Sequence, residues 1–114
     1  MSLVKISQAQ GRVPVTVFHL QDRINLDNFA ELEETAKEAY DKGTRDLVID
    51  LTQAASLTSI AIRAIVIVHK MLSTDHDKHL KIAGPALIRE LLEIAGVTQY
   101  VEVYDTVEAA VASF

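Results

Sequence analysis

The chain has 114 residues, 49% of them hydrophobic and 24% charged, which fits one domain (residues 1–114) with a proper core and makes disorder a poor expectation. A formal net charge of −5 argues against electrostatic binding to nucleic acid, and the lack of cysteine excludes disulfides, thiol catalysis and thiolate metal sites. The start does not resemble a signal peptide and no apolar run approaches the roughly 20 residues that span a bilayer, so we expect a cytoplasmic protein without membrane insertion.

Two β-strands are predicted at the start of the chain. Residues 3–7 alternate weakly between apolar and polar, and residues 13–20 are rich in β-branched and aromatic side chains. The polar segment 8–12, which contains Gly11, is predicted to be the turn that joins them into a hairpin. Pro14 lacks a backbone N–H, so it favours an edge strand or the end of a strand.

A helix is predicted next, because apolar residues recur at helical spacing while Glu and Lys occupy the other face. Its apolar positions are Phe29, Leu32, Ala36, Ala39 and Tyr40. Asn25 or Asp27 can cap its start, and Gly43 supplies its end. The short, almost continuously apolar run 45–51 follows and indicates a buried central strand.

Helices and strands alternate through the rest of the chain. The predicted ranges are 59–72 (helix), 78–84 (strand), 85–96 (helix, with Pro in its first turn and Gly at its end), 100–104 (strand) and 105–114 (helix). For the last helix, Asp105 or Thr106 is the expected N-cap and Glu108 its capping partner. The resulting order, β-β-α-β-α-β-α-β-α, predicts a single α/β domain with a mixed, mostly parallel sheet and helices packed on it.

The sequence contains no motif of an enzyme active site. G-x-S-x-G, the P-loop and G-x-G-x-x-G are all absent, and four glycines are too few for a glycine-rich phosphate cradle. Asp22, Asp27, Asp46 and Asp50 have no spacing that demands acid–base chemistry. We therefore predict no catalytic residues, no enzymatic activity and no cofactor.

The segment Asp75–His79, DHDKH, places two histidines and two aspartates within five residues. A surface metal site is conceivable, because imidazole and carboxylate groups are both metal ligands. Short clusters of this kind are usually solvated loops, so we predict no metal site. His19 and His69 have no neighbouring motif and are predicted to be ordinary strand and helix residues.

The helix predicted over 59–72 has more apolar surface than its seat on the sheet requires. The stripe that seats it consists of Ala61, Ala64, Ile65, Val68 and Leu72. Ile62 and Val66 fall on the outer face, together with Ser59 and Arg63. They either form a docking patch or are covered by a neighbouring helix, and the sequence leaves both interpretations open.

Two hydroxyl residues, Thr58 and Ser59, stand at the start of this helix. In one interpretation they cap it, by accepting hydrogen bonds from its first backbone amides. In the other they are phosphorylated, since the free amides and the helix dipole favour a phosphate at this end. A phosphate would add about −1.5 to −2 charge beside the apolar patch and so switch off docking of a partner.

Two segments carry a likeness to a known family. LVIDLTQAASLTSIAIRAI has a strand that ends in an Asp-Leu-Ser type of turn and then a short motif that opens an apolar helix. LKIAGPALIRELLEIAGVTQYVEVYDTVEAAVASF has a strand, a proline at a helix start, a Leu-Leu-x-x-x-Gly-Val ending, a short strand and an acidic terminal helix. The chain thus resembles the STAS domain family (sulfate transporter and anti-sigma factor antagonist) over nearly its whole length, which implies a STAS-like fold.

In the antagonist branch of that family, a kinase that is itself an anti-sigma factor phosphorylates the first serine of an Asp-Ser-Ser-Gly motif. That position falls on Ser59, with Thr58 as the less favoured site. The resemblance implies that the unphosphorylated protein binds the anti-sigma factor kinase, that the phosphorylated form releases it, and that a phosphatase resets it. The surface expected to bind partners comprises Arg23, Asn25, Thr58, Ser59, Ile62, Arg63 and Val66. Any self-association is expected to be a weak homodimer.

A second hypothesis is a constitutive interaction module without control by phosphorylation. The family also includes scaffolds of the stressosome type and transporter-associated domains. Where the antagonists have Asp-Ser-Ser-Gly, this chain has Thr58-Ser59-Ile60-Ala61, and Asn25 stands at the position of another family aspartate. These departures favour the second hypothesis. Binding of a small ligand or nucleotide at the sheet edge has no motif to support it.

Overall fold

A mixed β-sheet forms the centre of the computed structural model, which describes residues 3–21, 23–54, 56–76 and 78–114. Within these residues the sheet has five strands in the spatial order β1-β2-β3-β4-β5. The strands are β1 (Val4–Gln10), β2 (Pro14–Leu20), β3 (Leu47–Asp50), β4 (Leu80–Ala83) and β5 (Glu102–Tyr104). β1 pairs antiparallel with β2, and the remaining pairs are parallel.

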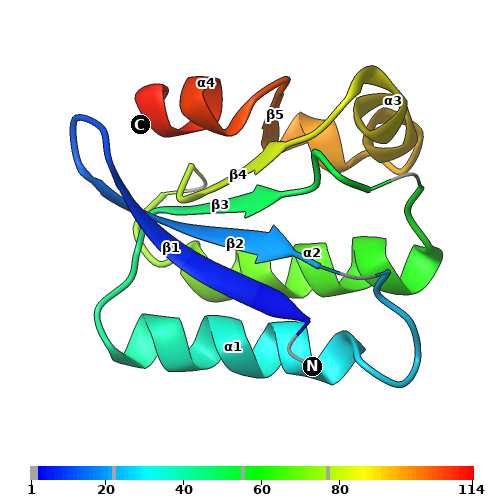
Figure 1. Ribbon diagram of the computed structural model, residues 1–114, viewed down its shortest axis with the longest axis horizontal. Coiled ribbons are helices and arrows are strands. Elements are labelled where there is room, and N and C mark those ends of the chain that lie inside the picture. Colours follow the sequence, from blue (N-terminus) through cyan, green and yellow to red (C-terminus); the bar gives the residue numbers. More distant parts are fainter. Residues whose placement is uncertain (1–2, 22, 55, 77) are drawn as a thin grey trace.

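Helices cover both faces of this sheet. They are α1 (Phe29–Asp41), α2 (Ser59–Leu72), α3 (Ala86–Ile94), the short 3₁₀ helix η1 (Val97–Gln99) and α4 (Val107–Ala112). α1 and α2 lie alongside each other across one face, and α4 lies over the opposite face (Figure 1). The predicted element order and the mixed, mostly parallel α/β architecture are confirmed.

The two helical layers explain the hydrophobic pattern of β3. Ile49 belongs to the larger core beneath α1 and α2, while its neighbour Val48 belongs to a smaller core beneath α4. Both side chains are fully buried. A strand that is covered on both faces needs apolar residues at successive positions, which is why this segment is a continuous apolar run rather than an alternating one.

The hairpin differs from its prediction. The polar turn predicted over 8–12 is wrong, because β1 continues to Gln10 and the bend lies at residues 11–13. β1 is an edge strand with one solvated side, so the exposed side chains of Gln8 and Gln10 are compatible with pairing to β2. Pro14 opens β2 and so takes the predicted position at a strand end.

The helix ends differ in detail from their predictions. The predicted caps of α1, Asn25 and Asp27, are wrong: its N-cap is Asn28, which makes no capping bond with its side chain. At α4 the N-cap is Thr106, whose Oγ1 accepts a hydrogen bond from the Ala109 N–H at 3.1 Å. Glu108 is therefore the second helical residue and cannot be the capping-box partner, which occupies the third.

Two glycines end helices as predicted. Gly43 follows α1 with φ 109°, and Gly96 follows α3 with φ 80°. These backbone conformations are open to glycine without strain. In the described parts of the chain, no helix has both the length and the apolar character that crossing a membrane requires.

The seat of α1 on the larger core provides a test of this packing. Leu32 in α1 is 0% exposed, whereas Leu26, just before the helix, is 75% exposed. We expect Leu32→Ala to lower the free energy of unfolding by about 2–5 kcal/mol, because it removes buried methyl groups and leaves a cavity. Leu26→Ala should change it by less than about 0.5 kcal/mol. Urea denaturation of both variants measures the difference, and equal effects would contradict the assigned packing.

Candidate functional site

Thr58 joins two segments of the chain at the N-terminus of α2. Its backbone is extended, and its Oγ1 accepts a hydrogen bond from the Ala61 N–H at 3.1 Å, which caps the helix. The same hydroxyl donates to the backbone oxygen of Ile24 at 3.0 Å. Because Ile24 is buried in the larger core, this second bond fixes the start of α2 to the segment that follows β2.

Ser59 is in a different position. It is the first residue of α2 and is exposed. Within the described residues, no hydrogen bond engages its hydroxyl. The structure therefore gives the capping role to Thr58 and leaves the Ser59 hydroxyl at the end of a helix where backbone amides and the dipole favour a negative group.

The segment around Asn25 is a turn stiffened by two asparagine side chains. Asn25 Oδ1 accepts hydrogen bonds from the N–H groups of Asp27 and Asn28, at 2.8 and 3.1 Å. Asn28 Oδ1 accepts from the Asn25 N–H at 2.7 Å, and its Nδ2 donates to the Arg23 backbone oxygen at 2.9 Å. Arg23 and Asn25 are both exposed, so this turn holds two of the predicted partner-binding residues on the surface.

A cleft of about 460 Å³ lies between this turn and the start of α2. Of the residues predicted to bind partners, Arg23 and Thr58 line this cleft, and the others do not: Asn25, Ser59, Ile62, Arg63 and Val66. Sequence reasoning missed the polar residues Gln21, Gln53 and Ser56, which also line it. A topological signal could have found them, because they follow the carboxyl ends of β2 and β3, where α/β sheets place their binding loops.

Asp50 shapes the loop between β3 and α2. Its Oδ1 accepts hydrogen bonds from the hydroxyl and the N–H of Thr52, at 2.6 and 2.9 Å, and its Oδ2 lies 2.6 Å from His19 Nδ1. Burial by itself raises the pKa of Asp50, but the hydrogen bonds from Thr52 and His19 bring that pKa below its ordinary value. His19, predicted to be an ordinary strand residue, also lies 2.7 Å from the Ser7 hydroxyl through Nε2.

The remaining predicted partner-binding residues continue along α2. Arg63 is exposed one helical turn beyond Ser59. Ile62 and Val66 are half-buried and pack against the larger core, on a helix that lies beside α1. Part of each side chain is therefore covered within the chain, as the helix-packing interpretation predicts, and part remains accessible.

The segment DHDKH lies beyond the other end of α2. The structure brings Asp75, His76 and His79 of this segment together. Asp77, like Asp22, lies outside the described residues. This cluster is separate from the cleft at the N-terminus of α2, since the two share no lining residue.

Comparison with known proteins is consistent across sequence and structure. The family model described as the STAS domain matches residues 7–110. "Putative anti-sigma factor antagonist BtrV" of Bordetella bronchiseptica is 30% identical over 95 residues, which cover 83% of this chain and 82% of that protein.

Two solved structures share the fold. The crystal structure of an anti-sigma factor antagonist from Mycobacterium paratuberculosis has a TM-score of 0.81 and 17% identity, covering 96% of this chain and 91% of that one. The crystal structure of a "putative anti-sigma factor antagonist" from Thermotoga maritima has a TM-score of 0.74 and 19% identity, covering 94% of this chain and 90% of that one.

The two bonds of the Thr58 hydroxyl give a stability prediction. We expect Thr58→Ala to lower the free energy of unfolding by about 1–3 kcal/mol, because it removes a helix cap and leaves the Ile24 oxygen without its donor. Thr58→Ser keeps the hydroxyl and should retain most of the stability. Ser59→Ala is the matched control, with an expected change below about 0.5 kcal/mol. Urea denaturation of the three variants measures these changes in the free energy of unfolding. An effect of Ser59→Ala as large as that of Thr58→Ala would refute the assigned roles.

The hydrogen bonds of Asp50 give a pH prediction. Because its pKa is depressed in the folded protein, Asp50 stabilises the fold above its ordinary pKa, and this contribution is lost as the pH falls through the depressed value. Thr52→Ala should raise the Asp50 pKa and make acid destabilisation less steep, while Thr52→Ser should preserve both. Carboxyl ¹³C NMR titration measures the pKa directly. An Asp50 midpoint that Thr52→Ala leaves unchanged would show that Thr52 does not stabilise the carboxylate.

Proposed function

The chain belongs to the STAS domain family, and from this premise we propose that it is a bacterial anti-sigma factor antagonist controlled by phosphorylation of Ser59. In its unphosphorylated form it binds a cytoplasmic anti-sigma factor with serine kinase activity and so relieves inhibition of a sigma factor. Phosphorylation releases the partner, and a phosphatase restores binding. The protein acts as a regulator of transcription and not as an enzyme. The similarity to proteins named anti-sigma factor antagonists supports this class of partner.

The contrast between two adjacent hydroxyls carries the proposal for Ser59. Thr58 uses its hydroxyl as both donor and acceptor, so its phosphorylation would remove the bond to the buried Ile24 segment. Ser59 is exposed, and a kinase can reach its hydroxyl without disturbing the cap. Phosphotransfer requires the attacking oxygen to align with the γ-phosphate, and an exposed hydroxyl outside the hydrogen-bond network meets that need at least cost.

A phosphate on Ser59 would act on the partner surface rather than on the fold. Its charge of about −1.5 to −2 is favourable at a helix N-terminus, so α2 should stay intact. Arg63 follows Ser59 by four residues and thus lies on the same side of the helix. In the unphosphorylated form Arg63 can pair with an acidic group of a partner, and a phosphate on Ser59 would compete for it. Loss of this pairing and burial of a new charge would both weaken docking.

The residues that stand in place of two family aspartates are compatible with this role. Thr58 and Asn25 each stand where the family pattern has aspartate, and each keeps an oxygen that accepts backbone hydrogen bonds. The cap and the turn thus persist without the two negative charges. Ala61, at the family glycine position, is buried, so its methyl group packs into the core. These departures also support the second candidate, a constitutive scaffold or transporter-associated module, because they alter the residues around the phosphorylation site.

Binding to a partner distinguishes the two candidates. We expect Ser59→Asp to weaken binding to the cognate anti-sigma factor kinase by at least about tenfold, which is about 1.4 kcal/mol, while Ser59→Ala binds like the wild type but is not phosphorylated. Ala86→Asp is the matched control, since Ala86 is also the exposed first residue of a helix and lies in α3. Calorimetric titration with the purified kinases of the same genome measures the affinities.

Two results would overturn the proposal that phosphorylation of Ser59 controls binding to the partner. One is a Ser59→Asp variant that binds its partner as tightly as the wild type, which favours a constitutive module. The other is an Ala86→Asp variant that loses as much affinity as Ser59→Asp, which places docking elsewhere or reveals a general effect of charge.

A further inference from the structure

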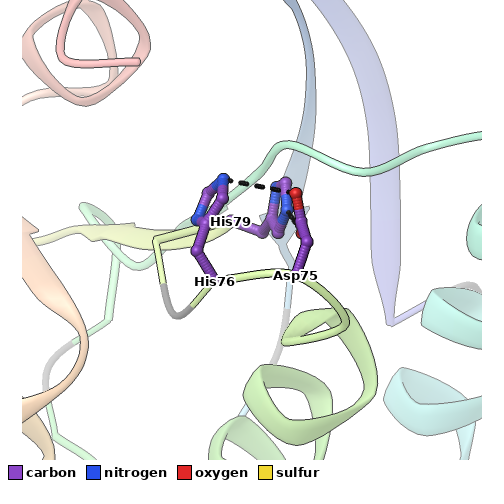
Figure 2. A group of neighbouring side chains, drawn as sticks. All are labelled: Asp75, His76 and His79. Carbon is purple, nitrogen blue, oxygen red and sulfur yellow. Dashed lines mark hydrogen bonds and ion pairs between the residues drawn. The ribbon is translucent and has the colours of Figure 1, made fainter.

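Three potential metal ligands converge on the loop that joins α2 to β4. Asp75 and His76 are exposed, and His79 is buried immediately before β4. Figure 2 shows that the three side chains face one another. One ligand atom from each, a carboxylate oxygen and two ring nitrogens, lies within 4.8 Å of the others.

His79 is held in the orientation of a metal ligand by a residue distant in sequence. Its Nδ1 lies 2.7 Å from Oδ1 of Asp46, which precedes β3, so the Nδ1 proton is donated to that carboxylate. This bond directs Nε2 towards Asp75, whose Oδ1 lies 2.5 Å away. Because a carboxylate only accepts hydrogen bonds, Nε2 also carries a proton, which it must release to solvent when a metal ion binds there. Metal-bound histidines typically donate their second ring N–H to a carboxylate in this way, which fixes the ring and raises its basicity. Asp46 therefore acts as a positioning residue.

The other two groups can adjust around this fixed nitrogen. The side chain of His79 is only 10% exposed, whereas those of His76 and Asp75 are 52% and 66% exposed. Ligands of a tetrahedral zinc ion at about 2.0–2.2 Å lie roughly 3.4 Å apart. The ligand atoms that now lie up to 4.8 Å apart must therefore move closer, whereas His79 Nε2 and Asp75 Oδ1, now 2.5 Å apart, must separate. Rotation of the two exposed side chains, Asp75 and His76, provides both adjustments without movement of the sheet.

His76 must change one hydrogen bond to become a ligand. Its Nδ1 accepts from the Lys78 N–H at 3.1 Å, and its Nε2 lies 3.8 Å from Asp75 Oδ2. A neutral histidine that binds metal through Nε2 carries its proton on Nδ1, so the bond from Lys78 must give way. The exposed ring can turn towards the ion, and the Lys78 N–H can then bond to water.

We propose that Asp75, His76 and His79 bind one divalent transition-metal ion of the zinc class, with Asp46 positioning His79. Two imidazole nitrogens and one carboxylate oxygen suit Zn²⁺, Co²⁺ or Ni²⁺ better than Mg²⁺ or Ca²⁺, which prefer all-oxygen sites. Three protein ligands leave a fourth position open for water or for a ligand from a partner. This departs from the sequence-based prediction of no metal, which lacked the long-range contact to Asp46. It is independent of the proposed role of Ser59.

Titration of untagged, chelator-treated protein with Co²⁺ and Zn²⁺ tests the site. We expect one ion per chain, visible in the Co²⁺ absorption spectrum and by calorimetry, and a shift of the His76 and His79 ring signals in NMR. Asp75→Asn and His76→Gln should weaken binding by at least about tenfold. Asp46→Asn should weaken it about 10–100-fold with the stoichiometry unchanged. Asp105→Asn and His19→Gln are matched controls outside the cluster and should bind like the wild type.

The outcomes are decisive even if changes at the buried His79 disturb folding, because Asp75 and His76 are exposed and their variants should fold. The proposal is wrong if the wild type shows no saturable binding of either ion up to millimolar concentration. It is also wrong if the double variant Asp75→Asn/His76→Gln binds with wild-type affinity, or if His19→Gln loses as much affinity as His76→Gln.

Discussion

The hydroxyl group of Thr58 holds together the surface on which the proposed function depends. It caps α2 through the Ala61 N–H and reaches the backbone oxygen of Ile24, 34 residues earlier in the chain. Since Ile24 is anchored in the core, the start of α2 and the turn after β2 form one unit. Ser59 is exposed beside this unit, and the capping bond is made by its neighbour Thr58.

The sheet places this unit at the carboxyl ends of β2 and β3. Asp50 terminates β3 and, through its bonds with Thr52, starts the loop that leads to Thr58. α2 then crosses the sheet beside α1, so its two ends belong to different surfaces of the molecule (Figure 1). One end carries the hydroxyls and the cleft, and the other leads to the histidine cluster. α2 thus separates the surface proposed to be phosphorylated from the proposed metal site.

Local signals in the sequence were sufficient for most of the fold. The apolar stripe and the hydroxyl cap predict α2 with its observed bounds, and the apolar run around Ile49 predicts a strand buried on both faces. Contacts between distant segments could not be inferred in the same way. The bond from Thr58 to Ile24, the bond from His79 to Asp46 and the cleft lined by Gln53 all depend on how the strands are ordered. The asparagine turn before α1 was also missed, because Asn25 bonds within the turn instead of capping the helix.

The central claim is a division of roles between adjacent hydroxyls, with structure assigned to Thr58 and regulation to Ser59. Mapping of phosphorylation sites by mass spectrometry, on the protein isolated from its native cells under several growth conditions, tests it most directly. The account predicts phosphate on Ser59, at an occupancy that changes with conditions, and none on Thr58. Phosphate on Thr58, or no phosphate on either residue under any condition, would contradict it.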